Sequence, residues 1–202
     1  MIKDYFGSLI KVYFNIKDNV KKFYQNSNFY DKKISKSFNN NFEYKPSPYL
    51  LSSIIKYKKK KYIIEDFSLE AIWQNNINSK DFEKLNNFFW FFSLDLKSSK
   101  KNTQSVIINW INNNQKYNSK SWDFDITSKR IISWLSNHRL TYEDSDIEYR
   151  TRFDAIIQKQ TNHLLNEINN SDEFENKMIG CAAIILVGLS YRNDKNYLNN
   201  GL

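Results

Sequence analysis

The sequence predicts an all-α protein, because turn residues are scarce and apolar residues recur at helical spacing. The chain has 202 residues, of which 41% are hydrophobic, so it is long enough to bury a core. Four Gly and two Pro are too few for the tight turns that β-sandwiches and β-barrels need at each strand connection. From residue 79 onward, apolar residues return every three or four positions, which is typical of helices with one buried face.

Residues 1–70 form a basic N-terminal region that we expect to be partly irregular. Residues 1–62 carry fourteen Lys against four Asp or Glu, so the excess behind the net charge of +8 lies here. The opening residues 1–23 mix apolar and charged side chains and predict a short amphipathic helix rather than a secretion signal. The loop sequence at 45–48 and the lysine tract at 58–61 show no clear period.

Residues 71–202 are expected to form a helical domain. The first helix is predicted over 81–94, and its apolar stripe has four members: Leu85, Phe88, Phe89 and Phe92. A second helix is predicted to begin at the capping residues Asn102 or Thr103 and to end in the breaker run 112–114. We expect it to form a hairpin with the third helix.

Three more helices are predicted downstream. Asp125 is the expected N-cap of the third, over 126–137, whose inward stripe is Ile131, either Trp134 or Leu135, and His138. A fourth helix spans about 146–169. The fifth, 174–191, is apolar almost all round and is expected to be the most buried, with Cys181 as a buried thiol. Its apolar run of about twelve residues is too short to cross a bilayer, so no transmembrane segment is predicted.

The pattern stops shortly after a sixth helix is predicted to begin. Asp194 is a possible N-cap, and Tyr197 and Leu198 are the first apolar pair of that helix. An array of helices that stops inside its next unit is expected to belong to something longer.

Several stretches resemble the N-terminal helical domain of heparinase II/III-like polysaccharide lyases. They are the aromatic run 87–96, the segment 106–111, the segment 122–136 with its Trp, Asp, Lys-Arg and Trp-Leu, and the apolar stretch 182–189. The resemblance covers residues 72–202. It implies an incomplete (α/α) toroid of antiparallel helical hairpins, which in that family precedes a β-sandwich domain.

The resemblance also implies an activity and a location. The family cleaves uronate-containing acidic polysaccharides by β-elimination, needs no cofactor, and is expected in the periplasm. A donor neutralises the uronate carboxylate while Tyr or His transfers protons. The nearest match to the family's carboxylate-neutralising Asn is Asn176, although Lys177 follows it where the family has His. The catalytic His and Tyr are expected to be absent from this chain, so the fragment is expected to be inactive alone.

The residues themselves suggest one carboxylate-binding group. Arg130, with Lys129 beside it, has a guanidinium fork suited to a sugar carboxylate, and Trp122 offers a flat face for stacking. In the alternative interpretation, Asp125 caps a helix, Arg130 makes a local ion pair, and Trp122 is core. His138 and His163 fall on different helices, which predicts surface or hydrogen-bonded residues rather than a metal site or a catalytic pair.

Two other functions remain open. The chain is either a non-catalytic helical module that binds a polyanion or a protein through its basic N-terminal third, or a remnant with exposed apolar helix faces. Nucleic acid is an unlikely partner, because the lysine tract has no interleaved Arg and no recognised nucleic-acid motif is present.

Overall fold

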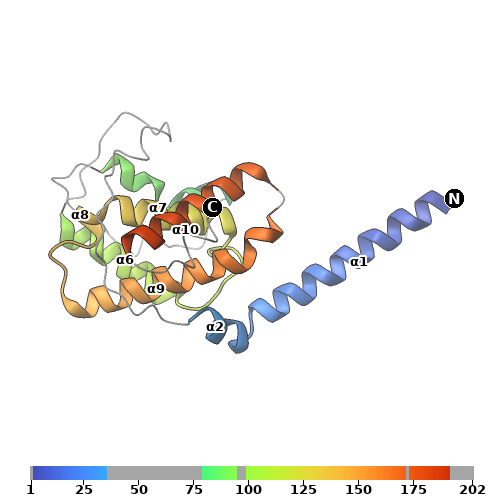
Figure 1. Cartoon of the computed structure of the whole chain (residues 1–202), viewed down its shortest axis with the longest axis horizontal. Coiled ribbons are helices and arrows are strands. Elements are labelled where there is room, and N and C mark those ends of the chain that lie inside the picture. The colour runs from blue at the N-terminus through green and yellow to red at the C-terminus, as the bar shows by residue number, and fades with distance from the viewer. Residues whose placement is uncertain (1, 36–78, 95–98, 172, 192–202) are drawn as a thin grey trace.

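The computed structural model describes residues 2–35, 79–94, 99–171 and 173–191, with side chains from residue 10 onward. Within these ranges all regular structure of more than one residue is helical, which confirms the all-α prediction. The α-helices are α1 (Ile2–Gln25), α2 (Asn28–Ile34), α5 (Ser79–Asn86), α6 (Lys100–Asn114), α7 (Phe124–Ser136), α8 (His138–Thr141), α9 (Ile147–Glu167) and α10 (Phe174–Ser190). Two short 3-10 helices are also present: η1 (Phe89–Ser93) follows α5, and η2 (Ile168–Asn170) follows α9. Most helices gather into one body, and α1 projects away from it (Figure 1).

Helix α7 lies at the centre of the body. Its most extensive contact is with α10, and it also contacts α5, α8, α9 and η1. Ten of its thirteen residues are buried. The expectation that 174–191 is the most buried helix is therefore wrong. In α10, Phe174, Met178 and Leu189 are 77%, 57% and 45% exposed. Two buried serines of α7 satisfy their hydroxyls with carbonyl oxygens: Ser128 donates to Phe124 at 2.7 Å and Ser133 to Phe88 at 2.6 Å.

The contact between α7 and α10 depends on a glycine. A Cβ atom at Gly180 would lie 2.3 Å from Cζ of Phe124, so only glycine fits the present packing. The next residue, Cys181, is only partly buried, which corrects the expectation of a buried thiol. At the other end of α10, the Tyr191 hydroxyl donates to Asp154 of α9 at 2.8 Å and fixes α10 against α9.

Within the basic N-terminal region, residues 2–25 and 28–34 are helical. The predicted amphipathic helix is present, but α1 is long, with 24 residues. Ser27 caps α2, where it accepts a hydrogen bond from the backbone N–H of Tyr30. Tyr30 and Ile34 bury their side chains in the core, and this contact holds α2 against α9. The loop at 45–48, the lysine tract and the sixth helix at 194–198 lie outside the described residues.

The helix expected over 81–94 is broken in the middle. Helix α5 ends at Asn86, and Phe88 adopts a left-handed backbone with φ of 57°. The break lets Phe88 turn into the core, where its ring centroid lies 5.1 Å from that of Trp134 and 6.3 Å from that of Trp110. The side chain of Asn87 accepts a hydrogen bond from Phe89 N–H and stabilises the turn. Aromatic burial therefore overrides the helical period.

Two predicted N-caps are displaced by a few residues. Ser99, rather than Asn102 or Thr103, caps α6, and Asp123, rather than Asp125, caps α7. Asp123 accepts hydrogen bonds from the backbone N–H groups of Asp125 and Ile126. Asp146 caps α9, accepting from Tyr149 N–H at 2.7 Å.

The second and third predicted helices correspond to α6 and α7, which do not pack side by side as the expected hairpin. Helix α6 packs on α8 and α9, and it meets α7 through the rings of Trp110 and Trp134, whose centroids are 5.5 Å apart. In the described ranges, no helix is both long enough and apolar enough to span a membrane.

The substitution Gly180→Ala should destabilise the protein. Overpacking against Phe124 costs about 1–3 kcal/mol, which exceeds the roughly 1 kcal/mol that alanine adds in helix propensity. Denaturant unfolding should show a lower free energy of unfolding for Gly180→Ala. The double variant Gly180→Ala/Phe124→Leu should lose less than the sum of the single variants, since the shorter side chain makes room. Strict additivity would contradict the contact.

Candidate functional site

Two adjoining cavities open beside the N-terminal ends of α7 and α10. The larger, about 1020 Å³, is lined by α5, the end of α6 and the loop 118–123, and we call it the asparagine cleft. The smaller, about 480 Å³, lies between α1, α9 and the same loop, and we call it the α1 cavity. Four residues line both: Ser119, Asp123, Asp125 and Asn176.

The asparagine cleft is lined mainly by neutral hydrogen-bonding side chains. Its amides and hydroxyls belong to Asn86, Asn113, Asn114, Asn118, Asn176, Ser79, Ser119 and Ser121. Phe82, Leu85 and Ile126 add apolar surface. Two buried polar atoms of the wall, Oγ of Ser121 and Oδ1 of Asp125, have no hydrogen-bond partner among the described residues. Such a wall suits a ligand rich in hydroxyl groups.

The aspartates of the cleft are already engaged within the protein. Asp123 accepts from the first amides of α7, and Asp125 forms an ion pair with Nζ of Lys129 at 2.5 Å. Their charges are therefore largely compensated. Glu83 and Lys120 also line the cleft and carry opposite charges.

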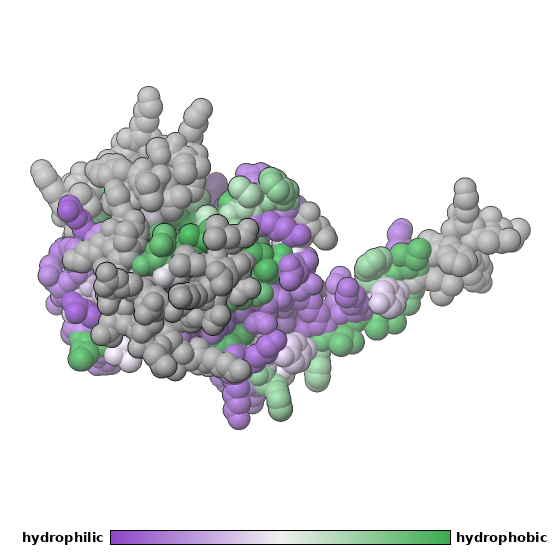
Figure 2. All heavy atoms as spheres, in the orientation of Figure 1, coloured by the Kyte–Doolittle hydropathy of each residue, from purple (hydrophilic) through white to green (hydrophobic). Residues whose placement is uncertain are grey.

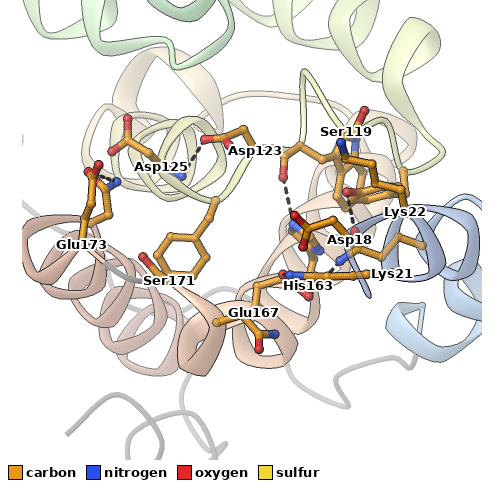
Figure 3. A pocket seen from close by; sticks show the side chains of 16 residues that line it. Asp18, Lys21, Lys22, Ser119, Asp123, Asp125, His163, Glu167, Ser171 and Glu173 are labelled. Carbon is orange, nitrogen blue, oxygen red and sulfur yellow. Dashed lines mark hydrogen bonds and ion pairs between the residues drawn. The ribbon is translucent and has the colours of Figure 1, made fainter. Parts of the chain in front are cut away.

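The α1 cavity contains a network of ionised and hydrogen-bonded groups. In Figure 3, Lys21 and Lys22 of α1 lie across the cavity from Glu173. Glu167 forms an ion pair with Lys21 and accepts a hydrogen bond from Nε2 of Gln25 at 2.8 Å. Gln25 in turn accepts from the Tyr117 hydroxyl at 2.9 Å. The network fixes the last turn of α1 against α9.

His163 lies in the wall of this cavity as a neutral structural residue. Its Nε2 is 2.8 Å from the carbonyl oxygen of Trp122, so Nε2 carries the hydrogen, and Nδ1 accepts from the Tyr30 hydroxyl at 2.7 Å. Burial, aided by the charges of Arg130 and Lys21 and opposed by the bond to Trp122, lowers the pKa of His163 to about 4. The prediction of a hydrogen-bonded histidine is confirmed here. His138 is also buried, with its Nε2 3.4 Å from a carboxylate oxygen of Glu143.

Tyr117 remains a neutral donor at neutral pH. Burial, together with the negative charges of Glu167 and Asp123, raises the pKa of its hydroxyl to about 12. Neither Tyr117 nor His163 is therefore suited to remove a proton from a substrate at neutral pH.

Arg130 lies in the core and not at either cavity surface. Its side chain is fully buried, and burial lowers the pKa of the guanidinium. The guanidinium donates to the carbonyl oxygens of Asn86 and Ser121, both at 2.9 Å, and to side-chain oxygens of Gln160 and Thr127, both at 3.2 Å. It also lies 4.0 Å from the centroid of the Trp110 ring. These contacts correct both the sugar-carboxylate role and the local ion pair, because every acceptor is neutral and internal.

The other sequence-predicted residues are divided between core and surface. Trp122 is fully buried and donates through Nε1 to the carbonyl oxygen of Asn114 at 3.1 Å, so it presents no face to a sugar. This placement corrects the expected stacking role and matches the core alternative. Lys129 is partly exposed and pairs with Asp125. Asn176 lies in the first turn of α10, at the edge of both cavities, where its Nδ2 donates to Glu173 at 2.7 Å.

Apart from Asn176, the asparagines of the cleft were missed as site residues. Asn113 and Asn114 belong to the run 112–114, which the sequence identifies only as the end of a helix. The run of consecutive asparagines was a usable signal of a polar site, because amide side chains grouped at a helix end form a polar surface.

The described residues contain no cluster of three or more His, Cys, Asp or Glu side chains able to hold a metal ion. Comparison with known proteins identified no relative: no family model, no curated protein and no solved structure matches this chain.

Replacing Arg130 by Lys should destabilise the fold by about 2–4 kcal/mol, because an ammonium group lacks the fork that reaches separate acceptors and leaves buried carbonyls unpaired. The measurement is denaturant unfolding. Arg139→Lys is the matched control, since Arg139 is exposed on the neighbouring helix α8, and it should change stability little. Equal stability of the two variants would contradict the structural role of Arg130.

Stability should fall between pH 6.5 and pH 4 through His163. Its pKa is about 4 in the folded protein against the ordinary histidine value of 6.5, so the unfolded chain binds a proton in this window that the folded protein does not. The contribution is complete above pH 6.5 and decreases as the pH falls, by up to about 3 kcal/mol. Unfolding of the wild type and of His163→Gln at both ends of the window tests this. The variant should lose less stability on acidification than the wild type.

Proposed function

We propose that this chain is the helical part of a heparinase II/III-like polysaccharide lyase and binds a uronate-containing polysaccharide in the asparagine cleft. In this proposal the described helices belong to an incomplete (α/α) toroid. The observation that carries the proposal is the position of Asn176, the residue that the family resemblance singles out, at the edge of a cleft rich in amides and hydroxyls. Sugar hydroxyls both donate and accept hydrogen bonds, as these side chains do.

The cleft has the size and chemistry of a binding site for a short oligosaccharide. Its volume of about 1020 Å³ is at the upper end of typical ligand pockets. Phe82 and Leu85 offer apolar surface to the carbon faces of a sugar ring, and the unpaired Oγ of Ser121 lies in the same wall. The ion pair of Asp125 with Lys129 reduces the repulsion that a negatively charged polymer would meet.

Asn176 is the group best placed to meet a uronate carboxylate. An amide nitrogen carries two hydrogens, so one remains for a carboxylate oxygen after the bond to Glu173. Asn176 lies in the first turn of α10, whose N-cap residue Glu173 makes no capping hydrogen bond with its side chain. The amides and dipole of the helix terminus favour a negative charge here. A neutralised carboxylate makes the neighbouring carbon-bound proton easier to remove, since the developing enolate is stabilised.

In this proposal the proton-transfer groups come from outside the described residues. Both ring nitrogens of His163 are occupied, and the raised pKa of Tyr117 makes it a poor base. The helical part therefore supplies binding and carboxylate neutralisation.

Asn176→Ala should weaken binding of a uronate oligosaccharide, such as a short oligogalacturonate or heparosan fragment, by about tenfold or more, because a hydrogen bond to a charged group is lost. Calorimetric titration measures the dissociation constant. Asn169→Ala is the matched control, since Asn169 is exposed and lines neither cavity.

Two results would contradict the proposal. Equal affinities of the two variants would remove Asn176 from the site. Ultraviolet detection of an unsaturated uronate product from this chain alone would contradict the assignment of proton transfer to groups outside the described residues.

A further inference from the structure

Helix α1 has an apolar face that no described part of the chain covers. The exposed fractions along it are 65% for Tyr13, 57% for Ile16, 64% for Val20 and 82% for Phe23. Figure 2 shows apolar side chains along the projecting helix, away from the body. Exposed apolar surface of this extent marks an interaction site, because a protein surface normally scatters its large apolar residues.

The apolar face is broad. At about 100° per residue, it covers an arc of roughly 160° from Val12 to Ile10. Within this arc lie Val12, Phe23, Ile16, Val20, Tyr13, Tyr24 and Ile10, with Lys17 near one edge. A two-helix coiled coil needs a narrower seam, whereas a helix lying in a membrane interface buries a face of this width.

The apolar face points away from the body of the protein. Lys21 and Gln25 contact Glu167 of α9 and lie about 140° and 180° around the helix from Ile16. Only the edge of the apolar face meets the body, where Tyr24 packs against Tyr30 of α2. If a flat surface contacted the apolar face, the body of the protein would therefore lie on the other side of the helix, away from that surface. The arrangement suits an extended surface, because the body does not block approach to the exposed face.

The charges of α1 favour a negatively charged surface over a second copy of the same helix. Between residues 10 and 25 the helix carries Lys11, Lys17, Lys21 and Lys22 against a single acid, Asp18. Self-pairing would bring lysines together with few carboxylates to balance them. Anionic lipid headgroups supply the opposite charge, and lysine side chains can extend from a helix in the interface to reach them.

We propose that α1 binds the surface of membranes that contain anionic lipids, with Tyr13, Ile16, Val20 and Phe23 inserted at the boundary between headgroups and acyl chains. Lys17, at the edge of the apolar face, contacts the headgroups. The helix lies along the surface and does not cross it. This inference rests on α1 alone and is independent of the proposed function.

The experiment is sedimentation of the full chain with vesicles made of equal parts phosphatidylcholine and phosphatidylglycerol, and with vesicles of phosphatidylcholine alone. The wild type should sediment with the anionic vesicles and much less with the neutral ones, and added salt should reduce binding. Absence of binding to the anionic vesicles at low salt would overturn the proposal.

Two double variants separate the α1 face from general surface hydrophobicity. Val20→Gln/Phe23→Gln should reduce the partition coefficient at least about tenfold, because two inserted apolar side chains are lost. Ile147→Gln/Phe174→Gln is the matched control, since these residues are 83% and 77% exposed on α9 and α10. The control should bind like the wild type, and equal losses in the two variants would overturn the proposal. Glutamine keeps helix propensity high, and circular dichroism checks that both variants are folded.

Charge and self-association are tested separately. Lys17→Gln should lower binding to anionic vesicles about fivefold and leave the weak binding to neutral vesicles unchanged. Sedimentation velocity without lipid should show the same oligomeric state for the wild type and for Val20→Gln/Phe23→Gln. Dissociation of an oligomer by this variant, with no vesicle binding by the wild type, would assign the face to a second copy and overturn the proposal.

Discussion

The buried guanidinium of Arg130 is the interaction on which the rest of the body depends. A charge in the core is tolerated only when hydrogen bonds replace its lost hydration. Arg130 obtains these bonds from Asn86 at the end of α5, Ser121 in the loop before α7, and Gln160 on α9, while the ring of Trp110 on α6 covers its face. One side chain therefore joins four parts of the chain. Because Asn86 and Ser121 also line the asparagine cleft, the same bonds hold two of its walls in place.

The aromatic residues around α7 show how packing sets local structure. A continuous helix over 81–94 would leave some of its aromatic side chains pointing to solvent, because a helix faces the core on one side. The break at Asn87 and Phe88 places Phe88, Phe91 and Phe92 in the core on different sides of the chain. The left-handed backbone of Phe88 has a conformational cost, and its complete burial against the rings of Trp110 and Trp134 offsets it.

The chain presents two surfaces of different chemistry. The asparagine cleft is polar and mostly uncharged, as expected for a site that recognises hydroxyl groups, whereas α1 presents aromatic and aliphatic side chains next to lysines. The ion pair of Lys21 with Glu167, and the bonds through Gln25 and Tyr117, fix the last turn of α1 beside the α1 cavity. The orientation of the apolar face is thus set by polar contacts on the opposite side of the same helix.

The local sequence predicts the helical class and the long helices near 146–169 and 174–191. These features depend on the apolar period of each segment and on the scarcity of turn residues. Tertiary structure decided that Asp123 rather than Asp125 caps α7, that the aromatic helix breaks, and that Arg130 and Trp122 are core residues. The partners responsible lie far along the chain, such as Gln160 for Arg130 and Ser133 for Phe88. At the site, the resemblance identified Asn176, but not the asparagines and serines around it, because a cleft forms only when separate helices pack.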